Sequence, residues 1–267
     1  MKLHIRHETH YQYEVAPEHL LQNLRLTPET NAHQTVLDWA VEAPGKLLAM
    51  RDGNGNVMHQ YNLTHDRRFT QFVVLAIGQV QTQAQAWLTD GKYALPPSFY
   101  LQATPLTEPN AAIASFARSV IPGGANAESV VALAQAVCSH VRYMTGSTDV
   151  ATSAQEAFTQ GMGVCQDQAQ VFLAACRCLG LPARYVSGYF YAPGASELAS
   201  HACADVCLDV QAGLWFGLDI THGCPLDERH VRLAVGADYA ACPPVRGMQR
   251  GGAGEQLRVV LEINQEG

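Results

Sequence analysis

The sequence is poor in charged residues and contains no long apolar run. Only 15% of its 267 residues are charged, against about 25% in an average globular protein. The 17 Lys and Arg are outnumbered by 24 Asp and Glu, and the net charge of −7 without a basic run argues against a nucleic-acid or anionic-membrane partner. No apolar run approaches the roughly 18 residues that a transmembrane helix needs. A hydrophobic content of 48% excludes a disordered chain.

The opening residues also lack a secretory signal. MKLHIRHETHYQYEV contains neither an apolar h-region nor a small-residue cleavage site, so we expect a cytoplasmic, reducing location. In such a compartment, cysteines are more often buried hydrophobic residues, metal ligands or nucleophiles than disulfide partners. Eight are present, at positions 138, 165, 176, 178, 203, 207, 224 and 242. Their number alone does not choose among these roles.

The pattern of the chain changes near residue 95, and its length exceeds the usual size of one domain. The earlier part alternates like β-structure, including 71–83, and a run of turn residues at 52–56 predicts a hairpin. Four prolines within 89–110 mark the change in composition. We therefore expect a β-rich N-terminal domain over 1–95 and a second domain over 96–267.

The second domain begins with helical periodicity and ends with strand periodicity. Three segments carry apolar residues at helical spacing and are expected as helices: 110–120, 126–142 and 165–179. Four later segments alternate with period two and are expected as strands: 183–191, 201–210, 214–220 and 256–263. A β-rich domain followed by helices and then antiparallel strands is an α+β organisation.

Cys165 is a candidate nucleophile because of its position. It follows Gly161-Met162-Gly163-Val164, where glycine permits a sharp turn, and it begins the third expected helix. A thiol at a helix N-terminus lies at the positive end of the helix dipole, which favours the thiolate. Taken alone, however, this local pattern is more often that of a small buried cysteine, the common role of an unpaired thiol.

His201 and Asp219 are the candidates for a base and for the group that orients it. His201 heads the polar face of the strand expected over 201–210. Paired positions in an antiparallel hairpin have a constant sum, so a wide loop centred on residue 210 would place His201 opposite Asp219. A tight turn at 212–213 would offset the two. Taken singly, each is also consistent with an ordinary residue at a strand end.

Together the three residue types form the scheme of an activated nucleophile, a base and an orienting group. His201 would take the proton of the Cys165 thiol, and Asp219 would hold the imidazole in one tautomer. The thiolate would attack an amide or ester carbonyl and form a thioester. The backbone N–H of Cys165, at the helix start, would donate one hydrogen bond to the oxyanion.

Three separated segments strongly resemble the bacterial transglutaminase-like cysteine peptidase family: GMGVCQDQAQVFLAACRCLGLPARYVSGY, SHACADVCLDV and WFGLDITHG. The family pattern is G-x-C-x-D, a helix, G-[IL]-P-A-R, then S-H-A and G-x-D. The resemblance implies a Cys-His-Asp triad of Cys165, His201 and Asp219 on a papain-like core. IRHETHYQYEV, NLRLTPET and DGNGNV also resemble the β-rich domain that precedes this core in the family, so the similarity covers most of the chain.

The chain departs from the family pattern around these residues. Gln168 and Gln170 stand where the family usually has an aromatic residue and a histidine. Cys203 replaces a usual Trp, and Ile220 replaces the Pro that often follows the Asp. No member of the triad is missing. The smaller side chains near Cys165 and His201 therefore bear on substrate preference rather than on the chemistry.

The remaining candidates have weaker support. Tyr189, Asp238 and Tyr239 are expected to line the substrate cleft. Cys203 and Cys207 share the His201 face of their strand but lack the C-x₂-C spacing typical of structural zinc. We therefore predict no metal site and no cofactor, although an adventitious metal at that face stays open.

The sequence thus predicts cysteine-dependent acyl chemistry on a peptide or protein amide through a thioester. Water as the acceptor would make the chain a peptidase or amidase, and an amine would make it a transglutaminase. The choice depends on how water is excluded from the cleft. The alternative is a non-catalytic peptide- or protein-binding module on the same fold, although a pure binding module would have no need of all three triad residues.

Overall fold

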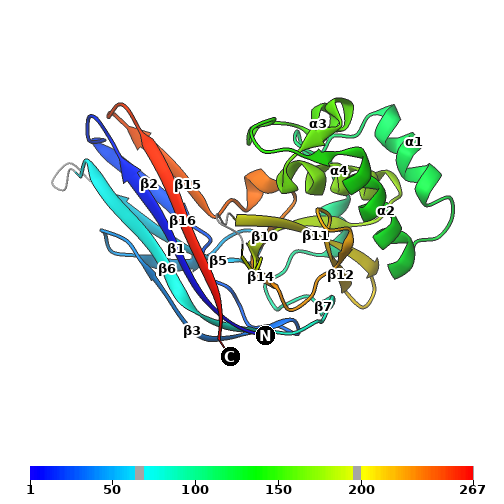
Figure 1. Cartoon of the computed structure of the whole chain (residues 1–267), viewed down its shortest axis with the longest axis horizontal. Coiled ribbons are helices and arrows are strands. Elements are labelled where there is room, and N and C mark those ends of the chain that lie inside the picture. The colour runs from blue at the N-terminus through cyan, green and yellow to red at the C-terminus, as the bar shows by residue number, and fades with distance from the viewer. Residues whose placement is uncertain (64–68, 195–199, 267) are drawn as a thin grey trace.

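The computed structural model describes residues 1–63, 69–194 and 200–266, which form a β-layer joined to a mixed α/β core (Figure 1). Within these residues no helix is long and apolar enough to cross a membrane. In the part of the chain that the structure describes, the β-layer contains two four-stranded antiparallel sheets. The first has the order β16 (Gln256–Glu266), β1 (Lys2–Gln12), β6 (Gln71–Thr82) and β3 (Gln34–Glu42). The second has the order β15 (Val245–Arg250), β2 (His19–Leu24), β5 (Val57–Leu63) and β4 (Leu48–Arg51).

The two sheets pack against each other through apolar side chains that alternate with polar ones along the sequence. Every second residue of β1 and β6 is buried, and these side chains share one apolar cluster with residues of β2 and β5. Burying one face of each strand in this way fixes the register of the sheet. The strand expected over 71–83 is confirmed as β6. The hairpin expected at 52–56 joins β4 to β5, with Gly55 at a φ of 86° that favours glycine.

Both ends of the chain contribute to the β-layer. β16 pairs with β1 from Lys2 opposite Glu266, and β15 pairs with β2. Figure 1 shows the two termini side by side at the edge of this layer. The expected second domain of 96–267 therefore does not hold for 245–266, whose sheet partners are N-terminal strands. Periodicity identifies a strand but not the distant strand with which it pairs.

Within the described residues, the core contains a six-stranded sheet with four helices (Figure 1). Its main path is β13 (Cys224–Pro225), β12 (Leu214–Asp219), β11 (Ser200–Asp209), β10 (Ala183–Phe190) and β14 (His230–Gly236), and β7 (Trp87–Thr89) pairs with β12. The helices are α1 (Ala111–Val120), α2 (Ala127–His140), α3 (Ala154–Gln160) and α4 (Cys165–Cys178). The short elements are η1 (Pro97–Leu101), η2 (Tyr239–Ala241) and the parallel pair β8 (Arg142–Tyr143) and β9 (Met162–Gly163).

Helix α4 lies at the centre of the core. All of its side chains from Asp167 to Arg177 are buried, because the other three helices contact it on some sides and β10 and β11 on another. Because such a helix has almost no side in contact with water, apolar residues can occupy most of its surface. Three helices, α1, α2 and α4, confirm the expected segments to within two residues at each end. The α+β class expected from the sequence is also confirmed.

Helix α3 was not expected, although its start carries a local signal. Ser153 Oγ accepts from the backbone N–H of Glu156 at 3.3 Å, and the Glu156 carboxylate accepts from the backbone N–H of Ser153 at 2.8 Å. This reciprocal capping box satisfies two backbone donors that a helix start otherwise leaves free. With only seven residues, α3 presents too few turns for its apolar periodicity to stand out.

Replacing Ser153 with alanine is expected to lower the free energy of unfolding by about 1 kcal/mol, because the cap of α3 is lost. Urea unfolding followed by circular dichroism measures the change. Ser119→Ala is the matched control, since Ser119 is an exposed residue inside α1 whose hydroxyl bonds the Phe116 carbonyl. Alanine favours a helix interior, so the free energy of unfolding of this control should not fall. Equal losses in both variants would contradict a capping role for Ser153.

Candidate active site

Cys165 is the first residue of α4, and its side chain is half-buried. The turn into the helix is held by Asp167, whose Oδ2 accepts from the backbone N–H of Val164 at 2.7 Å and from Thr148 Oγ1 at 2.6 Å. A Cβ on Gly163 would lie 2.7 Å from the Asp167 Cβ, so glycine is required for this close approach. The local sequence thus fixes the thiol at a helix N-terminus, as expected.

His201 and Asp219 are in direct contact, with His201 Nε2 2.8 Å from Asp219 Oδ2. Their register differs from the expected one. Ala204 pairs with Leu218, so the strand positions sum to 422 and His201 falls opposite residue 221 rather than Asp219. The turn lies at 210–213, and the imidazole reaches Asp219 diagonally across the two strands. The expectation of directly opposed residues was therefore wrong by two positions, whereas the contact itself is present.

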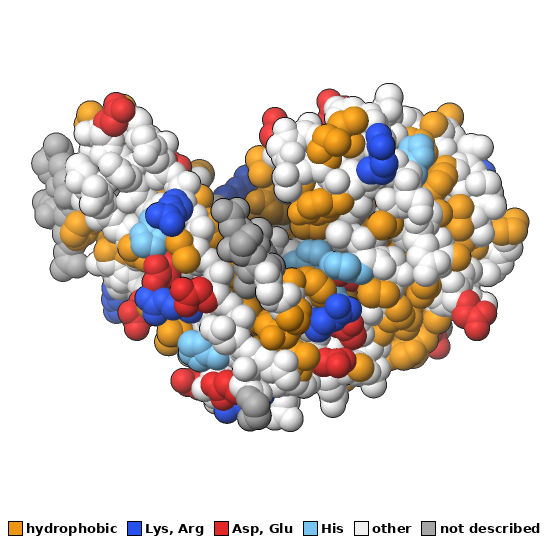
Figure 2. All heavy atoms as spheres, viewed as in Figure 1, with side chains coloured by type: hydrophobic (Ala, Val, Ile, Leu, Met, Phe, Trp, Pro, Cys, Tyr) orange, Lys and Arg blue, Asp and Glu red, His pale blue; other side chains and the backbone are white. Residues whose placement is uncertain are grey.

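Asp219 Oδ2 is also close to two further histidines. His222 Nδ1 lies 2.7 Å from it and His230 Nε2 lies 2.8 Å from it. Burial raises the pKa of the carboxyl group, but the hydrogen bonds from the three imidazoles hold that pKa well below its usual range. Figure 2 shows histidine side chains, in pale blue, in a recess of the core surface. The ring centroids of His201 and His222 are 5.9 Å apart.

The surroundings of His201 favour its protonated form. Burial lowers the pKa of the ring, but the sulfur of Cys203 and hydrogen bonds to Asp219, Cys165 and Cys203 raise that pKa well above its ordinary value. Because Asp219 occupies Nε2, the other ring nitrogen, Nδ1, is left for the thiol of Cys165. The three expected residues thus form a connected chain from thiol to imidazole to carboxylate.

His230 was missed by the sequence reasoning. It is buried, and its Nδ1 lies 2.9 Å from Asp227 Oδ1 while its Nε2 points to Asp219. Burial lowers the pKa of His230, but the hydrogen bonds to Asp219 and Asp227 outweigh it and raise the pKa. No local pattern marks this residue, because Asp219 comes from the end of β12 and Asp227 from the turn before β14.

An exposed apolar rim beside Cys165 was also missed. Tyr143, Met144 and Val150 are 54%, 46% and 61% exposed. The Met144 backbone N–H donates to the Gly163 carbonyl at 2.8 Å, and burial and the charge of Cys165 raise the pKa of the Tyr143 hydroxyl. Exposed apolar side chains at the mouth of a site are typical of ligand contacts. The only signal in the sequence is their presence within a stretch rich in Gly, Ser and Thr.

Two of the three residues expected to line a substrate cleft are buried. Tyr189 is 1% exposed, and its hydroxyl lies 2.8 Å from His7 Nδ1 in the contact between core and β-layer. Asp238 is 5% exposed and caps η2 by accepting from the Ala241 N–H at 3.0 Å. Both side chains therefore lie inside the protein rather than at its surface. Tyr239 is half-buried and packs edge-on against Tyr185, with ring centroids 5.9 Å apart.

Gln168, one of the departures from the family pattern, connects α4 to the segment that follows Asp219. Its Nε2 donates to the Val141 carbonyl at 2.7 Å, and its Oε1 accepts from Thr221 Oγ1 at 2.7 Å. A buried amide with both ends bonded holds the strand end in place. The substitution therefore keeps the position of Asp219 rather than disturbing it.

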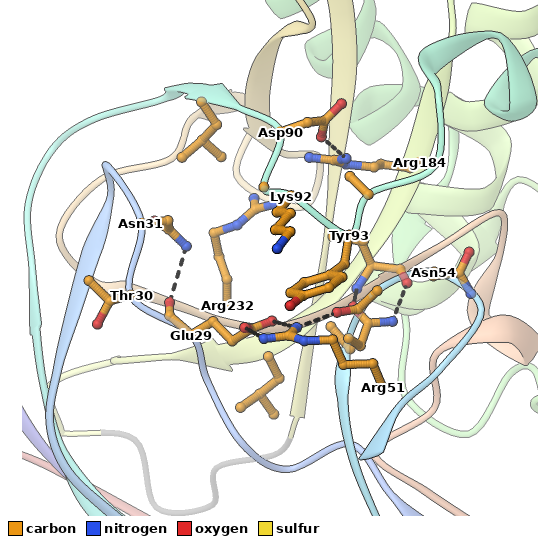
Figure 3. Close-up of a pocket in the computed structure, with 18 of the residues that line it drawn as sticks. Glu29, Thr30, Asn31, Arg51, Asn54, Asp90, Lys92, Tyr93, Arg184 and Arg232 are labelled. Carbon is orange, nitrogen blue, oxygen red and sulfur yellow. Dashed lines mark hydrogen bonds and ion pairs between the residues drawn. The ribbon is translucent and has the colours of Figure 1, made fainter. Parts of the chain in front are cut away.

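A polar pocket of about 310 Å³ lies apart from these residues, between the β-layer and the core sheet. Figure 3 shows Arg184, Arg232 and Lys92 beside it. Behind the pocket, Asp205 is fully buried and accepts from Arg232 at 2.7 and 2.6 Å and from Arg184 Nε at 2.8 Å. Neither Cys165 nor His201 lines this pocket, so the ion network is a structural feature of the interface.

Comparison with known proteins agrees with this architecture. The transglutaminase-like superfamily matches residues 114–220, and the bacterial transglutaminase-like N-terminal region matches residues 3–81. An uncharacterized protein of Mycobacterium leprae is 29% identical over 98% of both chains. One from Mycobacterium tuberculosis is 30% identical over 91% of this chain and 86% of its own.

Among solved structures, "a Putative Cysteine Protease from Cytophaga hutchinsonii" aligns with a TM-score of 0.77 at 22% identity, covering 99% of this chain and 90% of that one. At this identity the likeness shows a shared fold. The matched regions include strands β1 to β6 of the β-layer and the part of the core that carries Cys165, His201 and Asp219. The chain therefore belongs to the transglutaminase-like superfamily, as a member that carries the bacterial transglutaminase-like N-terminal region.

Proposed function

We propose that this protein cleaves or transfers the acyl group of a peptide or protein amide through a thioester on Cys165. The observation that carries the proposal is the position of His201, whose Nε2 lies 2.8 Å from Asp219 Oδ2 and whose ring is close enough to Cys165 for that thiol to raise the pKa of the imidazole. An imidazole held between a carboxylate and a thiol is the arrangement that activates a sulfur nucleophile. Family membership supports the same assignment.

In the proposed reaction, the Cys165 proton moves to His201 and the sulfur forms a bond with the carbonyl carbon. The Cys165 backbone N–H, at the first position of α4, has no acceptor within the helix and donates to the developing oxyanion. The C–N bond then breaks, and the leaving amine takes the proton from His201. Asp219 stabilises the imidazolium between these two proton transfers.

The thioester is then released by an acceptor whose proton again passes to His201. Water gives a carboxylic acid, and a primary amine gives a new amide. Incubating the protein with a glutamine-containing peptide and a fluorescent primary amine separates the two products. Release of acid or ammonia without amine incorporation would contradict the transglutaminase form, and amine incorporation would support it.

Iodoacetamide at neutral pH tests the activation of the nucleophile directly. We expect Cys165 to be labelled at least about tenfold faster than the other thiols, because the thiolate is the reactive species. Burial raises the pKa of each of the other seven: Cys138, Cys176, Cys178, Cys203, Cys207, Cys224 and Cys242. Peptide mapping after a short pulse measures the rates.

Two variants control this labelling experiment. Cys165→Ala should remove the fast phase, whereas Cys178→Ala, at the other end of α4, should leave it intact. Uniform labelling of all eight thiols in the unaltered protein would overturn the activation of Cys165 and favour a binding role for the fold.

A further inference from the structure

Cys203 is the residue beside the candidate active site that acyl transfer does not use. It follows His201 by two positions on β11, so both side chains lie on the same face of the strand. The side chain is buried, and its sulfur lies within 4.8 Å of a nitrogen of the His201 ring. It also stands at a position where the resemblance leads one to expect a Trp, so this thiol is a particular feature of the chain.

Four donor atoms of different chemistry converge at this point. His201, Cys203, Asp219 and His230 each offer one ligand atom, and these atoms all lie within 4.8 Å of one another. Two imidazole nitrogens, a sulfur and a carboxylate oxygen form a donor set that suits zinc, which prefers four tetrahedral ligands. Magnesium and calcium prefer oxygen ligands and are disfavoured here.

The spacing of the donors requires little movement to hold an ion. Asp219 Oδ2 lies 2.8 Å from Nε2 of His201 and 2.8 Å from Nε2 of His230. Tetrahedral zinc with bonds of about 2.0 to 2.3 Å separates its ligand atoms by about 3.3 to 3.6 Å. The two Asp219–histidine pairs therefore need to move apart by about half an ångström. The most widely separated donors, which lie within 4.8 Å of one another, need to draw together by about one ångström, which side-chain rotation can supply.

A second carboxylate supports this geometry independently. Asp227 Oδ1 lies 2.9 Å from Nδ1 of His230, so the opposite nitrogen, Nε2, is directed toward the other donors. Histidines that bind metals commonly donate their second N–H to a carboxylate, which fixes the tautomer and the ring orientation. His230 thus has the support expected of a ligand.

We propose that His201, Cys203, Asp219 and His230 bind one zinc ion, and that the ion reversibly blocks the active site. The Zn–S bond forms as the Cys203 thiol releases its proton to solvent. The protons that Nε2 of His201 and Nε2 of His230 donate to Asp219 are released to solvent as well, and the two freed Nε2 lone pairs are donated to the ion. His201 bound through Nε2 carries its remaining proton on Nδ1, so it has no lone pair to accept the Cys165 proton. The inhibition of the active site by zinc rests on the proposed acyl chemistry, whereas the binding of zinc to the four ligands does not.

Cobalt(II) tests the binding without any assay of activity. In the Cys165→Ala variant we expect Co²⁺ to produce the visible bands of a tetrahedral ion and a near-ultraviolet thiolate-to-cobalt band. Adding Cys203→Ser should abolish the thiolate band and raise the Kd for Zn²⁺ at least about tenfold. Cys207→Ser, a buried thiol on the same strand, is the matched control and should change neither.

Folding of each variant is checked by circular dichroism, and Cys203→Ala is the second variant if Cys203→Ser does not fold. Absence of a thiolate band in Cys165→Ala, or its persistence after replacement of Cys203, would overturn the site. The band would appear with the four ligands intact even if the protein had no amidase activity, so the two proposals can fail separately.

Inhibition is tested on the protein with Cys165 present. Zn²⁺ should stop amide turnover, a chelator should restore it, and Mg²⁺ at the same concentration should have no effect. The zinc concentration for half-inhibition should rise at least about tenfold in Cys203→Ser, measured against the metal-free rate of that variant. Equal zinc sensitivity with and without the Cys203 thiol would overturn the regulatory role.

Discussion

Amide turnover is expected to fall by at least about a thousandfold when Cys165 is replaced with alanine, because the methyl side chain cannot form the thioester. What remains is the contribution of substrate binding and of the backbone N–H at the start of α4, which the substitution leaves in place. Initial rates on a peptide amide measure the loss. Intact-mass spectrometry of the unaltered protein should show an acyl adduct on Cys165 during turnover.

The control for this result is a thiol in the same helix. Cys178→Ala removes a half-buried cysteine at the last position of α4, and its turnover should stay within a few-fold of the unaltered protein. Circular dichroism of Cys165→Ala should be unchanged, because Cys165 is only half-buried and its loss leaves no large cavity. Retention of activity in Cys165→Ala would assign the chemistry to another group.

Replacing Asp205 with alanine is expected to lower the free energy of unfolding by about 3 to 5 kcal/mol. The variant leaves two buried guanidinium groups without their shared carboxylate. Arg232 loses both of its bonds to Asp205, and Arg184 keeps its 2.6 Å contact with Asp90. Breaking a buried ion pair from one side is costly because the remaining charge stays away from water. Urea unfolding measures the difference.

The same carboxylate predicts a dependence on pH. Burial raises the pKa of Asp205, but Arg232 and Arg184 outweigh it and lower that pKa to about 2. Because the pKa of Asp205 is lower in the folded than in the unfolded protein, its ionised form stabilises the fold. This contribution to the free energy of unfolding is complete above the pKa of an unfolded aspartate, about 3.9, and is lost as the pH falls toward 2. Stability curves of Asp205→Ala should therefore be flatter than those of the unaltered protein across that interval.

An exposed acidic residue provides the control for Asp205. Glu262→Ala, on the exposed side of β16, should change the stability by less than about 0.5 kcal/mol. A loss in Asp205→Ala as small as that of Glu262→Ala would show that the two arginines find other partners or reach water through the adjacent polar pocket.

Local patterns in the sequence predicted most of the helices and strands of the core, but not which distant strands pair with one another. Helix α4 and strand β6 were expected because their periodicity extends over many residues. The pairing of β16 with β1 was not, since the two strands are separated by most of the chain. Tyr189 follows the period of a strand, but only the tertiary structure shows that the β-layer covers it.

The candidate site was predictable to the extent that its residues lie within local motifs. The position of Cys165 at the start of a helix follows from the glycines before it. The contact of His201 with Asp219 was expected from a strand register that placed the two residues directly opposite each other. The structure has the contact, but its register is shifted by two residues. His230 joins the site from a strand beyond β10, and nothing in its immediate neighbours indicates that contact.

The closure of the first sheet by β16 has a consequence for the order of folding. β1 lies between β6 and β16, so one edge of β1 has no partner until residues 256–266 have been synthesised. Contacts between such distant segments form slowly, and an exposed strand edge can pair with other chains in the meantime. The core sheet and its helices, by contrast, are complete once residue 236 has emerged from the ribosome. The core can therefore assemble first and serve as the surface on which the β-layer finishes folding.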